Sequence, residues 1–180
     1  EAFYNSSGGG ITLSGGEPLA QPEAALALAK AANTRGLSVV VDTCGHVPFE
    51  HFAAILPYTR LFLYDLKHPD DAEHQRLTGV GNKIILDNLR KLAAAGASLS
   101  LRLPLAADRN DRPQDLAAWL PLFEAIKPQR IHLLPYHSIG GSKSSRLGYP
   151  VFQGQPPTAS TLEHWLTTIQ NAGHPVQQGG

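Results

Sequence analysis

The sequence of 180 residues contains one cysteine, Cys44, and no methionine. A single thiol excludes an internal disulfide, which favours a cytoplasmic protein. The chain opens on Glu1 and carries no initiator. We therefore expect a processed chain or a piece of a longer protein.

An excess of charge of either sign is also missing, and so are long apolar runs. Lys and Arg together number 15, as do Asp and Glu, so the formal net charge is zero. Such a balance provides no basic field for nucleic acid. No apolar run approaches the roughly 20 residues of a membrane helix. Because 42% of the residues are hydrophobic and 17% are charged, we expect one globular domain, 1–180, without a nucleic-acid or membrane partner.

Short apolar segments alternate with segments of helical periodicity. Strands are expected at 11–14, 38–42, 61–67, 99–104 and 131–135. Helices are expected from Pro22 to Gly36, over 48–56, around 70–78, from Asn82 to Gly96, around 116–123 with a kink or an early end at Pro121, and from a capping box of Ser160 and Glu163 to Gly173. This alternation predicts an α/β fold with a parallel sheet, either barrel-like or open.

Polar residues collect toward the carboxyl ends of these strands. Because side chains alternate faces along a strand, each strand has an apolar row for the helices and an inward row that turns polar. The polar positions are Asp42, Asp65, Lys67, Arg102 and His137, together with Gly15, Gly16 and Glu17 after the first strand. These positions predict a functional cleft, because carboxyl ends of parallel strands are where α/β folds build their sites.

Simpler interpretations exist for several of these residues. Asp65 and Lys67 are two positions apart on one strand and fit a plain ion pair. Arg102 needs a partner if it is buried, either Asp65 or a ligand carboxylate. His137 taken alone is typical of a structural histidine. Cys44 has no cysteine partner and fits a small packing residue, and no histidine pair has the helical spacing of a zinc site.

The sequence resembles the glycyl-radical enzyme activating enzymes, the pyruvate formate-lyase activating enzyme family of the radical SAM superfamily. The opening motif is Ser-Ser-Gly-Gly-Gly-Ile-Thr-Leu-Ser-Gly-Gly-Glu-Pro at 6–18. Later blocks follow in the family's order at 42–45, 64–68, 77–80 and 133–137. The resemblance covers most of the chain and is weakest after the fifth strand.

The resemblance implies a partial TIM-like (β/α)6 barrel of parallel strands that binds S-adenosylmethionine and a [4Fe–4S] cluster. In such enzymes the reduced cluster cleaves S-adenosylmethionine, and the 5′-deoxyadenosyl radical takes a hydrogen from a glycine of the partner, a glycyl-radical enzyme. A flavodoxin or ferredoxin-type protein supplies the electron. Carried over residue by residue, Gly15, Gly16 and Glu17 receive the methionine amino group, Asp42, Thr43 and Asp65 lie near its carboxylate with a monovalent cation, and Lys67, Arg102 and His137 contact carboxylate and ribose.

One departure from the family concerns the cluster. Its ligands are a Cys-x3-Cys-x2-Cys loop after the first barrel strand, whereas this chain has only Cys44, after a different strand. We therefore expect the first βα unit to be missing, the cluster to belong to the full-length protein only, and this chain alone to be inactive. The loop at 106–111 also lacks the proline–glycine turn usual in relatives.

Two other functions remain open. A lyase or aldolase could use Lys67 as a Schiff-base nucleophile tuned by Asp65. A non-catalytic module could bind S-adenosylmethionine or a partner without chemistry.

Overall fold

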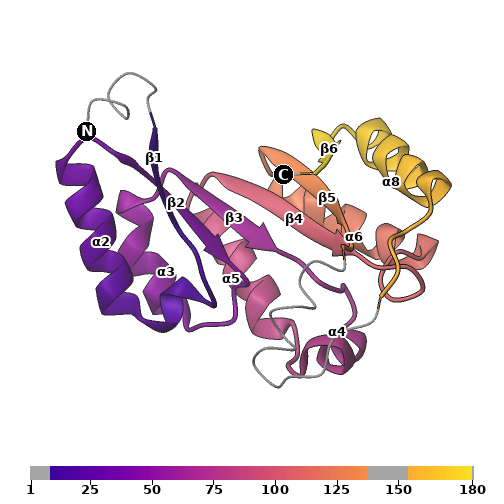
Figure 1. Ribbon diagram of the computed structural model, residues 1–180, viewed down its shortest axis with the longest axis horizontal. Helices are drawn as coiled ribbons and strands as arrows, with labels where there is room; N and C mark the ends of the chain where they lie inside the picture. The colour runs from indigo at the N-terminus through magenta and orange to yellow at the C-terminus, as the bar shows by residue number, and fades with distance from the viewer. Residues whose placement is uncertain (1–8, 138–153, 180) are drawn as a thin grey trace.

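The computed structural model describes residues 9–137 and 154–179. Six parallel strands form one sheet in the order β1-β2-β3-β4-β5-β6. Each crossover between neighbouring parallel strands is expected to be right-handed, which places the connecting helices on the same side of the sheet. Figure 1 shows α2, α3 and α5 beside the first strands and α8 beside β6.

The strands are β1 Gly10–Leu13, β2 Ser38–Thr43, β3 Leu61–Asp65, β4 Leu99–Leu105, β5 Arg130–Pro135 and β6 Val176–Gln178. The α-helices are α2 Pro22–Thr34, α3 Phe49–Ile55, α4 Asp71–Thr78, α5 Lys83–Ala94, α6 Pro113–Ile126 and α8 Ala159–Asn171. Two short 3₁₀ turns, η1 Pro18–Ala20 and η2 Leu56–Tyr58, complete the described elements. The prediction of a parallel α/β fold is confirmed, although the sheet stays open, with β1 and β6 at its edges.

The alternation along β3 shows how the sheet separates a core from a site. Phe62 and Tyr64 are 1% and 0% exposed and belong to the core. Leu63 and Asp65 point to the other face and keep part of their exposure. A strand with period two therefore buries one row against the helices and offers the other row as a surface.

Strand register decides which polar residues meet on that surface. Asp65 is paired with Arg102 across β3 and β4, and Arg102 with His132 across β4 and β5. Asp42 lies opposite Leu63, one pair earlier on β2 and β3. Residues paired in parallel register share a face, so Asp42, Asp65, Arg102 and His132 all lie on the open face.

Four details differ from the sequence-based expectations. The short strand β6 was not predicted, because Val-Gln-Gln carries no apolar alternation. Helix α6 continues past Pro121 to Ile126. Helix α8 begins two residues earlier than expected, where the Thr158 hydroxyl accepts from the Thr161 N–H in place of the expected Ser160 cap. Leu28 recurs at helical spacing with Ala25, Ala29 and Ala32, but it is 56% exposed while the three alanines are buried.

In the part of the chain that the structure describes, no helix has both the length and the apolar character required to cross a membrane.

Candidate functional site

Arg102 lies at the centre of a polar network on the open face of the sheet. Its Nε donates to Asp65 Oδ1 at 2.7 Å and its Nη1 to Asp42 Oδ2 at 3.2 Å, while Nη2 bonds Asp42 Oδ1. Lys67 Nζ donates to Asp65 Oδ2 at 2.7 Å, and Ser14 Oγ to Asp42 Oδ2 at 3.1 Å. The network thus joins the carboxyl-terminal ends of β2 and β3, the middle of β4, Lys67 beyond β3 and Ser14 after β1.

The charges of this network balance one another. Two carboxylates face one guanidinium and one ammonium, and every oxygen of Asp42 and Asp65 accepts a bond. The side chains of Arg102, Asp42 and Asp65 keep 20%, 22% and 18% exposure. Burial by itself lowers the pKa of Arg102, but Asp65 and Asp42 outweigh that effect and raise it. Arg102 is therefore a permanent cation that holds two like charges together.

The Glu17 side chain turns away from this network and binds the end of β2. Its two oxygens each accept from Thr43 Oγ1 at 2.9 Å, and Oε2 accepts from the Cys44 N–H at 2.9 Å. Oε1 also accepts from the Leu19 N–H at 3.2 Å, which caps η1. Both oxygens of the carboxylate thus accept hydrogen bonds from the protein itself, and these bonds connect the turn after β1 to the loop after β2.

That leaves the backbone of Gly15 and Gly16 at the exposed edge. Gly15 has φ +134°, a region that side chains rarely adopt. A Cβ placed on either glycine would meet no atom within 4 Å. The two residues therefore form an open cradle, in which peptide groups can approach a ligand directly.

Thr43 lies on the opposite face from Asp42. It is 2% exposed, and its hydroxyl also accepts from the Gly45 N–H at 3.0 Å. The structure therefore brings Asp42 and Asp65 together, but directs the Thr43 side chain toward the helices. Within residues 9–137 and 154–179, no group of three or more His, Cys, Asp or Glu side chains is arranged to hold a metal. The monovalent cation at Asp42, Thr43 and Asp65 stays a prediction.

His137 is exposed, beyond the end of β5, and makes none of the hydrogen bonds found among the described residues. The parity argument that placed it with Leu133 on the inward row was wrong for β5, since Leu133 is 0% exposed and lies in the core. The histidine that shares the face of Arg102 is His132. Its Nε2 lies 3.1 Å from Ser100 Oγ and its Nδ1 2.9 Å from the Gly179 carbonyl.

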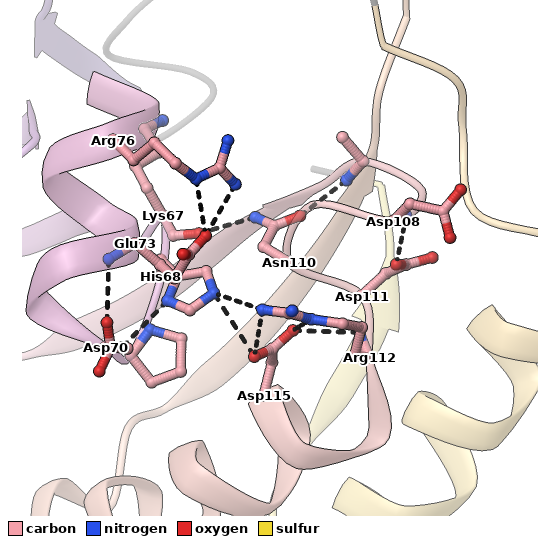
Figure 2. Close-up of polar contacts among 12 residues, drawn as sticks. Lys67, His68, Asp70, Glu73, Arg76, Asp108, Asn110, Asp111, Arg112 and Asp115 are labelled. Atoms are coloured by element: carbon pink, nitrogen blue, oxygen red, sulfur yellow. Dashed lines mark hydrogen bonds and ion pairs between the residues drawn. The ribbon is translucent and has the colours of Figure 1, made fainter. Parts of the chain in front are cut away.

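Asn110 holds the rim of the site together, although sequence analysis gave it no role. Its Nδ2 donates to the Lys67 carbonyl at 2.7 Å (Figure 2). The same Nδ2 donates to the Pro104 carbonyl at 2.7 Å, and Asn110 Oδ1 accepts from the Ala106 N–H at 2.8 Å. The loop after β4 is thus fastened to the chain that carries Lys67. An Asn-Asp pair following a strand was the available signal.

His68, next to Lys67, is anchored in the same region (Figure 2). It is 1% exposed, and its Nδ1 accepts from the Asp70 N–H at 3.0 Å. Its Nε2 lies 3.4 Å from Asp115 Oδ1 and 3.3 Å from Arg112 Nη2. Arg112 Nε donates to the other oxygen of Asp115 at 2.9 Å. These contacts fix the segment that follows Asp65 and Lys67 against the start of α6.

A pocket of about 280 Å³ adjoins the rim. Its lining includes Lys67, Leu77, Thr78, Pro104, Arg109 and Tyr136. The site therefore combines a charged network, a glycine cradle and a mostly apolar recess at the carboxyl edge of one parallel sheet.

A family model described as the radical SAM superfamily matches residues 1–120. The chain belongs to the radical SAM superfamily. Superfamily membership implies S-adenosylmethionine and a [4Fe–4S] cluster, and the sequence-based recognition of this superfamily is confirmed.

The curated relatives of this radical SAM chain include activating enzymes. It is 40% identical over 184 residues to the choline trimethylamine-lyase activating enzyme of Oleidesulfovibrio alaskensis, which covers 97% of this chain and 58% of that protein. It is 34% identical to the trans-4-hydroxy-L-proline dehydratase activating enzyme of Clostridioides difficile, over 99% of this chain and 61% of that protein. The chain thus spans about three-fifths of the length of these two relatives.

Solved structures agree with the fold. A domain of the pyruvate-formate lyase-activating enzyme from Bacteroides vulgatus superposes with a TM-score of 0.83 at 28% identity, covering 96% of this chain and 99% of that one. A radical SAM methyltransferase from Sphaerobacter thermophilus gives a TM-score of 0.70 at 16% identity, over 99% of this chain and 53% of that one. At that lower identity the likeness shows the fold alone.

The residues present fit one of the two implied groups. The open glycine cradle beside Asp42, Asp65, Arg102 and Lys67 provides both carbonyls for an ammonium and cations for a carboxylate, as a zwitterionic amino acid requires. A [4Fe–4S] cluster needs several thiolates, and this chain has Cys44 alone. The chain therefore fits S-adenosylmethionine and does not fit the cluster.

Proposed function

We propose that residues 1–180 are part of the single radical SAM core domain of a glycyl-radical enzyme activating enzyme. The protein partner is a glycyl-radical enzyme, a flavodoxin or ferredoxin-type protein is the reductant, and the location is the cytoplasm. The observation that carries the proposal is the convergence of Asp42, Asp65, Lys67 and Arg102 beside the Gly15–Gly16 cradle, in a chain 40% identical to the choline trimethylamine-lyase activating enzyme.

In this proposal the chain's own residues bind and orient the methionine part of S-adenosylmethionine. The Gly15 and Gly16 peptide groups receive its amino group, and the Lys67 ammonium meets its carboxylate. Arg102 keeps Asp42 and Asp65 in place through one N–H on each of its three nitrogens, and Nη1 and Nη2 each retain a second N–H that can donate to the ligand. S-adenosylmethionine held by these residues would supply the sulfonium group, whose radical chemistry would need an electron from the cluster of the complete protein.

His137 keeps its proposed contact with ligand ribose, but its exposed position leaves it free of the network. The monovalent cation is proposed at Asp42 and Asp65, with Thr43 able to contribute its main-chain carbonyl. Because the thiolates for a cluster are missing, we propose that this chain by itself is inactive.

The Schiff-base alternative has a specific observation against it. A nucleophilic lysine must be neutral, and low-polarity surroundings favour that state. Lys67 Nζ instead lies 2.7 Å from the Asp65 carboxylate, and its side chain is 35% exposed. Borohydride trapping of a carbonyl substrate on Lys67 would restore that alternative.

The test is an assay of the complete gene product that contains this chain. After anaerobic reconstitution with iron and sulfide, dithionite and S-adenosylmethionine should yield 5′-deoxyadenosine, and Asp65→Asn should reduce the yield at least tenfold. A gene product without a Cys-x3-Cys-x2-Cys segment, or one that gives no 5′-deoxyadenosine, would count against the proposal.

Calorimetry on this chain alone tests the alternative of a non-catalytic binding module. Without cluster iron to chelate the amino and carboxylate groups, S-adenosylmethionine should bind weakly or undetectably. Micromolar or tighter binding would instead support a module that binds the ligand without catalysis.

A further inference from the structure

Asn88 is a polar residue on the buried face of α5. It is 1% exposed and lies one turn after Ile85 on a face that also carries Leu89 and Leu92. Its Nδ2 donates to the Gly45 carbonyl at 2.9 Å and to the Val47 carbonyl at 2.7 Å. A buried amide that gives both protons to one loop fixes that loop in place.

The loop that Asn88 holds, residues 44–47, is the one that binds Glu17. The Cys44 N–H donates to Glu17 Oε2 at 2.9 Å, and the Cys44 thiol lies 3.1 Å from the same oxygen. Glu17 in turn accepts from the Leu19 N–H on its own segment. A continuous path of hydrogen bonds and three peptide units therefore runs from α5 to the segment that carries Gly15 and Gly16.

A second contact with α5 sets the shape of the same loop. Gly45 has φ +78°, and a Cβ on it would lie 1.9 Å from the Tyr64 hydroxyl oxygen. That hydroxyl donates to the Ile85 carbonyl at 2.7 Å, and Tyr64 is 0% exposed. Asn88 holds the loop against α5 by two hydrogen bonds, and the Tyr64 ring limits how closely the loop can approach the helix.

The glycine cradle has little else to fix it. Gly15 and Gly16 are exposed and have no neighbour within 4 Å of their Cβ positions. Their placement depends on the Ser14 hydroxyl that donates to Asp42, on β1 before them, on the anchored Glu17 side chain and on the turn of η1 after them.

We propose that Asn88 is a positioning residue, which sets the place of the Gly15–Gly16 backbone through loop 44–47 and the Glu17 carboxylate. The use of that backbone for a ligand amino group rests on the proposed function. The positioning itself is a property of this chain and is measurable without any ligand.

The main test is Asn88→Asp. This change keeps the shape of the side chain but removes both donors and turns an oxygen toward two carbonyls. Two-dimensional NMR of this chain should show shifted Cys44 and Leu19 amide signals, and hydrogen exchange at both amides should accelerate about tenfold or more relative to core strand amides. The Leu19 amide does not contact Asn88, so its response reports coupling through Glu17.

Asn82→Asp is the matched control. Asn82 is 3% exposed, and its Nδ2 also donates to two carbonyls, those of His68 and Pro69, at 2.9 Å each. The same chemical change at this position should lower stability by a similar amount, yet leave the Cys44 and Leu19 signals at their original positions. Unchanged Cys44 and Leu19 amides in Asn88→Asp, or equal changes in Asn82→Asp, would overturn the proposal.

The only thiol of the sequence gives an independent readout. At one fixed pH, alkylation of Cys44 should be several-fold faster in Asn88→Asp than in the parent chain. In a Glu17→Gln background the same substitution should have a smaller effect, because the path is already weakened. Additive effects of the two substitutions would contradict coupling between Asn88 and Glu17.

Asn88→Ser covers the case in which Asn88→Asp does not fold. Serine keeps one donor, so amide exchange and alkylation rates should fall between those of the parent chain and a variant without donors, such as Asn88→Leu. Since no measurement uses S-adenosylmethionine, a negative result removes the positioning role and leaves the proposed function standing. Failure to form 5′-deoxyadenosine would remove the function and leave the coupling intact.

Discussion

Arg102 shows, at the scale of single residues, how one side chain can organise a site. Its three donor nitrogens bind two aspartates whose charges would otherwise repel each other across neighbouring strands. Lys67 completes the neutralisation at Asp65, and Ser14 adds a neutral donor to Asp42. A balanced network of this kind is stable only while all of its members are present.

Arg102→Met should therefore destabilise the chain by about 1–3 kcal/mol at pH 7, less than for a fully buried pair because the partners keep about a fifth of their exposure. Urea denaturation measures the loss. The control is Arg76→Met in the exposed pair with Glu73, for which a clearly smaller loss is expected, because solvent screens exposed ion pairs. Equal losses in both variants would contradict a special role for Arg102.

Cys44 gives a prediction about pH. Burial, and then the nearby Glu17 carboxylate, raise the pKa of Cys44 from 9.0 to about 11, against the opposing effect of the His46 backbone. The folded state therefore binds the thiol proton more tightly than the unfolded state. Stability should consequently fall as pH rises from 9.0 toward about 11.

Alkylation rates of the folded chain test the same point. The rate should keep rising up to pH ~11, instead of levelling off near the ordinary thiol range of about 8.5–9. Glu17→Gln should move the profile to lower pH, because it removes a negative charge beside the sulfur. A plateau below pH ~9.5 in the parent chain would show that the thiolate is not disfavoured.

At the scale of elements, the loop between β2 and α3 depends on what packs against it. Gly45 has a positive φ and almost no space for a Cβ, because the Tyr64 side chain lies directly above it. Gly36, after α2, has a similar φ of +72° but open space around it. Alanine substitutions at the two glycines therefore distinguish the loss of stability caused by backbone conformation from the loss caused by crowding of the Cβ.

Gly36→Ala should cost only the left-handed conformation, about 1–2 kcal/mol. Gly45→Ala should cost clearly more, about 2–5 kcal/mol, since the Tyr64 ring must also move. Thermal or urea unfolding of both variants measures the difference. Equal losses of stability in the two variants would mean that the Tyr64 ring moves aside without strain. That result would also count against a role of Tyr64 in fixing loop 44–47.

Helix α5 contributes both to the hydrophobic core and to the loop beside the candidate site. Ile85, Leu89 and Leu92 bury its apolar face, as their spacing predicts, while Asn88 on the same face carries the loop of the site. Helix α6 continues through Pro121, because residues on both sides of it, Trp119 and Phe123, are packed in the core. Tertiary packing thus overrides the local preference of proline to end a helix.

At the scale of the whole molecule, a single core joins the two ends of the sheet. Val39 on β2 and Trp165 on α8 belong to one buried cluster. Trp119 and Trp165 report on the C-terminal half, while Cys44 reports on the N-terminal half. We therefore expect the described elements to unfold together.

Leu89→Ala tests this cooperativity. Leu89 is 0% exposed near the middle of the sequence, and its truncation should cost about 2–5 kcal/mol. Tryptophan fluorescence and Cys44 accessibility, followed in the same urea series, should shift to the same lower midpoint. Two separate midpoints would show that the halves of the sheet unfold independently.

Much of this architecture follows from patterns that are local in sequence. Alternation with period two separated Tyr64 from Asp65, and short strands spaced by helical segments predicted a parallel sheet. The positions of Asp42, Asp65, Lys67 and Arg102 at one edge followed from the same alternation, because parallel strands all end there. These properties depend only on burial and backbone geometry, which neighbouring residues specify.

The tertiary structure alone decided which groups bond to each other. Arg102 meets Asp42 across 60 positions, and Asn88 meets Gly45 across 43. Such pairs depend on how strands that are distant in the sequence align and on how helices pack against the sheet, and the pattern within one segment does not specify its partner. For the same reason the sequence-based prediction assigned His137 to the wrong row of β5 and missed β6. It also could not show that the Glu17 side chain hydrogen-bonds within the protein, while the backbone of the adjacent glycines remains exposed.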